Sequence, residues 1–122
     1  MGYKITISEN NKYIVVTYEG TFTLDLAKRS TKEFVEVLES TGIQRVLCDV
    51  RNTSNVMSVL EGFNYLNKYA GDIGFSKNVR LAGLASEHDK SYEFNETLAI
   101  NAGYNLKLFY SFQKANDWLT QY

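Results

Sequence analysis

The chain has 122 residues, of which 44% are hydrophobic and 22% are charged, and its formal net charge is −1. This length and composition are those of one ordinary globular domain, which can bury a core without disulfides or a structural metal. Thirteen basic residues against fourteen acidic ones give no concentrated positive field. The sequence therefore indicates neither a nucleic-acid-binding protein nor attachment to an anionic membrane surface.

The sequence contains one cysteine, Cys48, and one histidine, His88. These counts exclude an intramolecular disulfide and the usual multi-cysteine or multi-histidine metal sites. No apolar run approaches the roughly 18 residues of a membrane span, and the first residues lack a signal-peptide core. We therefore expect a cytoplasmic protein with no metal or other cofactor and no membrane insertion, in which Cys48 is a small core residue.

The first half of the chain predicts a β-hairpin, a long helix and a buried strand. The expected elements are strands at residues 3–8, 13–19 and 45–50 and a helix at residues 24–40. Thr23 is the predicted N-cap of the helix, and Gly42 is the predicted left-handed residue just beyond it. The strand RVLCDV at 45–50 lacks polar alternation, which is typical of a strand covered on both faces.

The second half alternates helices with short apolar strands. The expected elements are helices at residues 58–70, 90–102 and from Ser111 onward, with strands at 79–85 and 106–110. Apolar residues at helical spacing predict the buried faces, namely Leu60, Phe63, Leu66 and Ala70 in the first of these helices and Ala115, Trp118, Leu119 and Tyr122 in the last.

The resulting element order, ββαβαβαβα, predicts an α/β fold. We expect a single domain over residues 1–122, built on a mixed, largely parallel five-stranded sheet with about four helices. Strands that alternate with helices imply right-handed crossovers between parallel neighbours, and the opening hairpin adds an antiparallel strand.

Two stretches, VLCDVRN at 46–52 and LFYSFQKANDWL at 108–119, carry a resemblance to a known family. Together with the element order they resemble the SpoIIAA-like group, which takes in the STAS domains of anti-sigma-factor antagonists and the STAS/Sec14-like bacterial proteins. The resemblance implies the SpoIIAA-like fold and a non-enzymatic regulatory or protein-interaction domain. In the antagonists, a partner kinase phosphorylates a serine of an Asp-Ser-Ser-Gly motif that follows an Asp-bearing strand.

Ser58 lies nine positions after Asp49, near where that serine would fall, and is the candidate phosphoacceptor. Its neighbours are Met57 and Val59, so the acidic residue and the glycine of the motif are absent. A structural interpretation competes with phosphorylation, because Ser58 and Glu61 have the spacing of a helix capping box. Negative charge is nevertheless favourable at a helix N-terminus, so both interpretations stay open.

Polar residues lie at the carboxyl ends of three predicted strands: Asp49, Arg51 and Asn52 at the first, Ser86, His88 and Asp89 at the second, and Ser111 at the third. Ligands of open α/β sheets favour the carboxyl ends of parallel strands. We therefore expect these residues to share one rim that binds a ligand or a partner. The alternative is that Asp49 closes an Asx turn while Arg51 and His88 are solvated.

Nine tyrosines and seven phenylalanines are an uncommon aromatic load, and Tyr65, Tyr69, Phe75, Tyr92 and Phe94 gather around the second helix and the segments after it. Such residues either fill a core, as expected for Phe34, Phe63 and Trp118, or line an apolar pocket or interface. The Sec14-like side of the resemblance implies a lipid-type cavity, so the alternative function is a carrier or sensor of a small apolar ligand.

Neither a P-loop nor a G-x-S-x-G elbow occurs in the sequence. We therefore expect a non-enzymatic domain whose partner is a regulatory protein or a small apolar ligand. The hairpin edge and exposed aromatic residues also favour a homodimer.

Overall fold

Five strands form one sheet in the order β1-β2-β3-β4-β5. In the computed structural model, which describes residues 2–121, the strands are β1 (Tyr3–Ile7), β2 (Ile14–Phe22), β3 (Arg45–Asn55), β4 (Arg80–Leu84) and β5 (Asn105–Phe109). The β1 strand is antiparallel to β2, and every other neighbouring pair is parallel. The predicted mixed and largely parallel sheet is confirmed.

The helical elements are α1 (Leu24–Thr41), α2 (Val59–Asn64), the π-helical η1 (Tyr65–Tyr69), α3 (Ala70–Asp72), α4 (Glu93–Asn101) and α5 (Phe112–Thr120). The elements α2, η1 and α3 follow one another without a break and correspond to the helix predicted at 58–70. Thr23 caps α1 by accepting a hydrogen bond from the Leu26 N–H, and Gly42 ends that helix with φ +76°, both as predicted.

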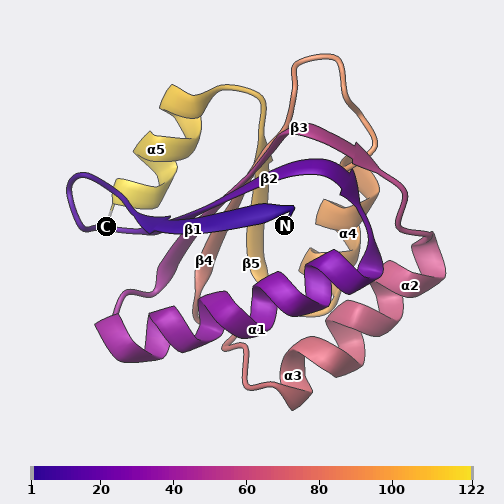
Figure 1. Cartoon of the computed structure of the whole chain (residues 1–122), viewed down its shortest axis with the longest axis horizontal. Helices are drawn as coiled ribbons and strands as arrows, with labels where there is room; N and C mark the ends of the chain where they lie inside the picture. Colours follow the sequence, from indigo (N-terminus) through magenta and orange to yellow (C-terminus); the bar gives the residue numbers. More distant parts are fainter. Residues whose placement is uncertain (1, 122) are drawn as a thin grey trace.

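The helices lie in two layers on opposite faces of the sheet (Figure 1). The three crossovers, through α1, through α2–α3 and through α4, each step one strand further in the same direction across the sheet. Because parallel β-α-β units are right-handed, successive steps in one direction place all three crossovers on one face. The last helix, α5, leads to no further strand and covers the other face, against β3, β4 and β5.

Two hydrophobic clusters stabilise these layers. The larger cluster packs α1, η1 and α4 against the sheet, and the smaller one packs Ala115 and Leu119 of α5 against Leu47, Ala82 and Leu84. The predicted burial of Ala115 and Leu119 is confirmed, whereas Tyr122 lies outside the described residues. Within residues 2–121, no helix combines the length and the apolar character needed to cross a membrane.

Candidate functional site

An irregularity in β3 shapes the edge of the site. Thr17 of β2 pairs with Asp49 of β3, but Glu19 pairs with Asn52, so β2 advances by two residues while β3 advances by three. The extra residue is a β-bulge, which reverses the face toward which the following side chains point. Thr53 and Asn55 consequently face α4.

The strand β3 is also longer than the sequence predicted. The sequence placed the end at residue 50, but β3 continues to Asn55 along β2, beyond the point where β4 stops opposite Asp49. Asp49 lies within the strand, as predicted, but Arg51 and Asn52 also belong to it and do not mark its carboxyl end. The polar residues after Val50 suggested a loop, but pairing with β2 satisfies their backbone groups.

An apolar pocket of about 120 Å³ lies between the sheet and the helices of the larger layer. Strands β2 to β5 supply its floor with Tyr18, Phe22, Cys48, Val50, Gly83 and Leu108. Gly83 leaves space at the floor of the pocket, because a Cβ there would lie only 3.3 Å from Leu108 Cδ1.

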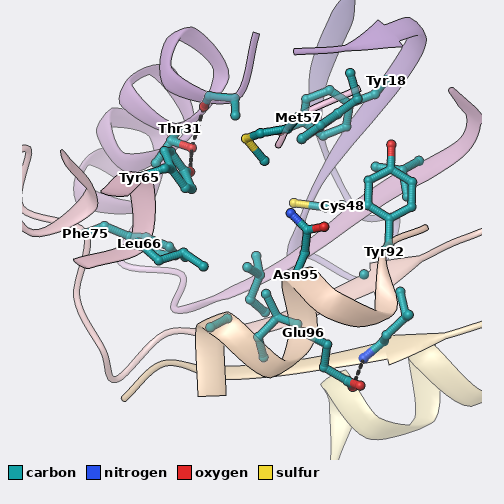
Figure 2. Close-up of a pocket in the computed structure, with 18 of the residues that line it drawn as sticks. Tyr18, Thr31, Cys48, Met57, Tyr65, Leu66, Phe75, Tyr92, Asn95 and Glu96 are labelled. Atoms are coloured by element: carbon teal, nitrogen blue, oxygen red, sulfur yellow. Dashed lines mark hydrogen bonds between the residues drawn. The ribbon is translucent and has the colours of Figure 1, made fainter. Parts of the chain in front are cut away.

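The helices and the segments before them supply the remaining wall, namely Thr31 and Phe34 of α1, Met57 before α2, Tyr65 and Leu66 of η1, Tyr92 just before α4, and Asn95 and Glu96 of α4. Figure 2 shows Met57 next to Tyr18, with Cys48 pointing into the space between the walls. Of the aromatic residues that the sequence placed around the second helix, Tyr65, Phe75 and Tyr92 line the pocket, whereas Phe94 is exposed.

A π-helical turn positions the tyrosines of η1. The Ala70 N–H donates to the Tyr65 carbonyl, so this turn holds one more residue than an α-helical turn. Tyr65 and Tyr69 stack with ring centroids 6.0 Å apart, and both hydroxyl groups reach α1. Such turns recur at functional sites, because they re-aim side chains without ending the helix.

Three tyrosine hydroxyls around the pocket share one pattern of hydrogen bonds. Tyr18 pairs with Ser30 at 2.7 Å, Tyr92 pairs with Thr53 at 2.6 Å, and Tyr65 pairs with Thr31. Each serine or threonine hydroxyl also donates to a backbone carbonyl of its own element. All three tyrosine hydroxyls are therefore engaged in hydrogen bonds within the protein.

The two remaining polar side chains of the helical wall are also engaged. The Glu96 carboxylate accepts the Leu108 N–H at 2.7 Å, which satisfies a backbone donor on the edge strand β5. The Asn95 side-chain oxygen accepts from Asn55 Nδ2 at 3.1 Å, an interaction that the bulge in β3 makes possible. The pocket wall is therefore apolar in effect, although it contains several polar residues.

Burial controls the ionisation of the pocket residues. Desolvation raises the pKa of the Cys48 thiol from 9.0 to about 12, more than the neighbouring Tyr18 hydroxyl lowers it. Burial likewise raises the pKa of Tyr92 to about 12, and it raises the pKa of Tyr18 well above its ordinary value. These groups are neutral at pH 7, so the pocket carries no thiolate nucleophile.

Ser58 forms the capping box that its spacing predicted. Its hydroxyl accepts from the Glu61 N–H at 3.1 Å, and the Glu61 carboxylate accepts from the Ser58 N–H at 2.8 Å. The structural interpretation of Ser58 is confirmed by these two bonds. The residue is also exposed, and its phosphorylation stays a prediction.

Asp49 and Arg51 lie on the opposite face of the sheet from the apolar pocket. Arg51 Nε and Nη2 donate to the two Asp49 oxygens at 2.9 and 2.7 Å, and the Arg51 backbone N–H donates to Oδ1 at 3.1 Å. The hydrogen bond with Asp49 is the main cause that raises the pKa of Arg51. The local turn predicted for Asp49 is present, but Arg51 is paired rather than simply solvated.

The other predicted rim residues do not join this pair in one cavity. The shallow groove beside Asp49 and Arg51 is lined by β1, the hairpin turn and residues Phe112 and Asn116 of α5. Asn52 and His88 are exposed, Ser86 is half-buried, Asp89 accepts from the Ser91 N–H at 2.9 Å, and Ser111 caps α5. A binding role for any of the seven residues stays a prediction.

An exposed apolar patch begins at the end of β3, and sequence periodicity assigned two of its four residues to the core. The patch consists of Val56, Val59, Leu60 and Phe63 and is called here the α2 patch. Leu60 is 68% exposed and Phe63 is 50% exposed, so the prediction that they face the core is wrong. The first turns of the helix extend beyond the sheet, and only Gly62, Leu66 and Ala70 of this helix are buried.

The apolar pocket and the adjoining α2 patch are the two candidate sites of the protein. Within residues 2–121, no three His, Cys, Asp or Glu side chains converge as metal ligands. The sequence indicated the aromatic load, but it gave no signal for the bulge in β3 or for the π-helical turn.

Solved structures of similar fold cover nearly the whole chain, although their sequences have diverged. An uncharacterised protein of the DUF3478 family with a SpoIIAA-like fold, from Shewanella loihica PV-4, has a TM-score of 0.60 and 21% identity, over 96% of this chain and 91% of that one. An anti-sigma factor antagonist from Mycobacterium paratuberculosis has a TM-score of 0.59 and 8% identity, over 98% and 95%. The anti-sigma factor antagonist SpoIIAA in its unphosphorylated form has a TM-score of 0.54 and 10% identity, over 98% and 99%. No protein-family model and no curated protein matches the sequence.

Proposed function

Because the chain is a domain of the SpoIIAA-like fold, we propose that it is a non-enzymatic, cytoplasmic regulator that binds a protein partner through the α2 patch. Two of the structurally similar proteins are anti-sigma factor antagonists, which supports a regulatory role. The partner would be a regulatory protein with an apolar surface, because the patch offers apolar side chains.

The exposure of the α2 patch is the observation that carries this proposal. Four large apolar side chains between residues 56 and 63 are exposed, Val56 just before α2 and the other three within it, whereas surface apolar residues are ordinarily scattered. The capping box of Ser58 and Glu61 holds that helix start in place, and Asn55 holds the preceding segment by donating to the Ser91 carbonyl at 3.1 Å. A rigid apolar surface suits recognition, because little ordering entropy is lost on binding.

The test compares partners captured by the tagged protein from its own cells with those captured by Leu60→Asp/Phe63→Asp. The two charges would be buried unpaired in the proposed interface, so the variant should lose the specific partner. Phe112→Asp is the matched control, because Phe112 is 47% exposed but lies on α5, on the opposite face of the sheet. The partner identified in this way is then titrated with the purified proteins by calorimetry.

A partner that binds wild type and the Leu60→Asp/Phe63→Asp variant equally would refute the role of the α2 patch. Self-association is a separate outcome, measured by light scattering over a range of protein concentrations. If the wild type dimerises and the double variant is monomeric, the patch is a homodimer interface rather than a surface for a different protein.

Phosphorylation of Ser58 is a second hypothesis about the same surface. It is supported by the exposed hydroxyl at a helix start within the α2 patch. A phosphate would add negative charge among apolar side chains and should weaken partner binding. Mass spectrometry of the protein isolated from its own cells tests this idea, and consistently unmodified Ser58 would refute it.

The alternative function, a carrier or sensor of a small apolar ligand, is supported by the apolar pocket under Met57. A pocket and an interaction surface are compatible within one regulatory domain. Native mass spectrometry of freshly purified protein tests for a retained ligand, and a clean apo mass would contradict a tightly held cargo.

A further inference from the structure

We propose that the apolar pocket is a sensing site for a small, uncharged molecule of the size of a single ring, and that Met57 moves to admit it. The existence of this binding site is independent of the α2 patch acting as an interface. Only its regulatory consequence, a change in the α2 patch when the pocket fills, rests on the proposed function.

The volume of the pocket defines the size of the ligand. A dry engineered cavity of about 150 Å³ binds benzene, whereas pockets for drug-sized ligands usually measure roughly 300–1,000 Å³. At about 120 Å³, the pocket holds one small ring or a short alkyl chain. A complete lipid does not fit, so the ligand is smaller than the lipid-type cargo that the sequence resemblance implied.

The wall of the pocket defines the chemistry of the ligand. The hydroxyl groups of Tyr18, Tyr65 and Tyr92 are hydrogen-bonded to the hydroxyl groups of Ser30, Thr31 and Thr53 in the surrounding protein. The Glu96 carboxylate already accepts a backbone N–H, and burial keeps the Cys48 thiol neutral. A ligand with a negative charge would lose its hydration, find no Lys or Arg among the lining residues and meet the Glu96 carboxylate, so the site excludes anions and its apolar lining favours uncharged molecules.

Met57 is the pocket-lining side chain best placed to move aside for a ligand. It stands in the short segment between β3 and α2, half-buried, with its side chain at the pocket beside Tyr18 (Figure 2). Methionine has an unbranched and flexible side chain, so it can repack around a guest at low cost. Its neighbours Val56 and Val59 belong to the α2 patch, so a displacement of Met57 is transmitted directly to that surface.

The experiment uses the full chain labelled with ¹³C at the methionine methyl groups. The sequence has two methionines, Met1 and Met57, so the signal of Met57 is assigned by comparison with Met57→Leu. Toluene should shift the Met57 signal saturably, whereas benzoate, the same ring with a negative charge, should leave it unchanged. A saturable shift with benzoate, or none with toluene, would overturn the proposal.

Substitution of Cys48 tests whether toluene binds in this pocket. Cys48→Leu adds two heavy atoms to the floor and should weaken toluene binding at least tenfold, whereas Cys48→Ala enlarges the space and should retain binding. Equal affinity of wild type and Cys48→Leu would contradict the assignment. Hydrogen exchange of residues 56–64, measured with and without toluene, tests the regulatory step separately. Unchanged exchange despite toluene binding would reject the coupling between the pocket and the α2 patch. Loss of partner binding in Leu60→Asp/Phe63→Asp is judged independently of both results, because it tests the proposed function.

Discussion

Filling the pocket should stabilise the protein, and Cys48 is the position at which the expected gain is largest. The thiol points into the apolar pocket of about 120 Å³. Leucine adds two heavy atoms, and each buried methylene equivalent contributes about 0.8 kcal/mol, which gives about 1.6 kcal/mol. We expect Cys48→Leu to raise the free energy of unfolding by about 1 kcal/mol after some repacking strain, and Cys48→Ala to lower it by about 1 kcal/mol.

Urea unfolding at pH 7 measures both changes, provided that the dependence of stability on urea stays constant across the variants. Ala82→Leu is the matched control, because Ala82 is fully buried on the neighbouring strand but packs against α5 instead of lining the pocket. Overpacking there should cost roughly 1–3 kcal/mol. If Cys48→Leu proves as destabilising as Ala82→Leu, the pocket has no usable volume and the reasoning about it fails.

Three further predictions concern single interactions. Ser58→Ala should lower the free energy of unfolding by about 1 kcal/mol, while Ser58→Asp, which can still cap the helix, should stay close to wild type in the same urea experiment; equal losses would show that capping is unimportant. Thr53→Val and Tyr92→Phe should each cost about 1 kcal/mol, and a double-mutant cycle should reveal a coupling of at least ~0.5 kcal/mol, whereas strict additivity would argue against their 2.6 Å hydrogen bond. Between pH 9 and 12 the unfolded chain loses the Cys48 proton while the folded chain keeps it, so stability should fall as pH rises through this window; from pH 8 to pH 10 wild type should lose about 1.4 kcal/mol more than Cys48→Ala, and parallel pH profiles would contradict the raised pKa.

The sequence was sufficient for those features that depend on local chemistry. Thr23 and Ser58 cap helices where capping signals predicted them, and Gly42 adopts the left-handed conformation that ends α1. These features involve hydrogen bonds between residues a few positions apart, so the pattern contains all the participants. The strand and helix order followed in the same way, and it carried the resemblance to the SpoIIAA-like fold.

The candidate sites depended on contacts between residues far apart in the chain. Periodicity placed Leu60 and Phe63 in the core, but burial depends on whether another element covers that face, and the helix start extends beyond the sheet. The paired residues Asp49 and Arg51 suggested a ligand rim, yet their carboxylate and guanidinium groups bind each other.

By itself, the sequence determined the element order, the helix ends, the largely parallel sheet and the aromatic load, because each is expressed in local periodicity or composition. Only the tertiary structure decided where the aromatic side chains meet. The bulge in β3 brings Thr53 to Tyr92, and the π-helical turn brings Tyr65 to Thr31, 34 positions away. Each irregularity adds one residue to a regular element and is stabilised by residues far away in the sequence. The local sequence pattern does not indicate those distant residues, so it could not predict either irregularity.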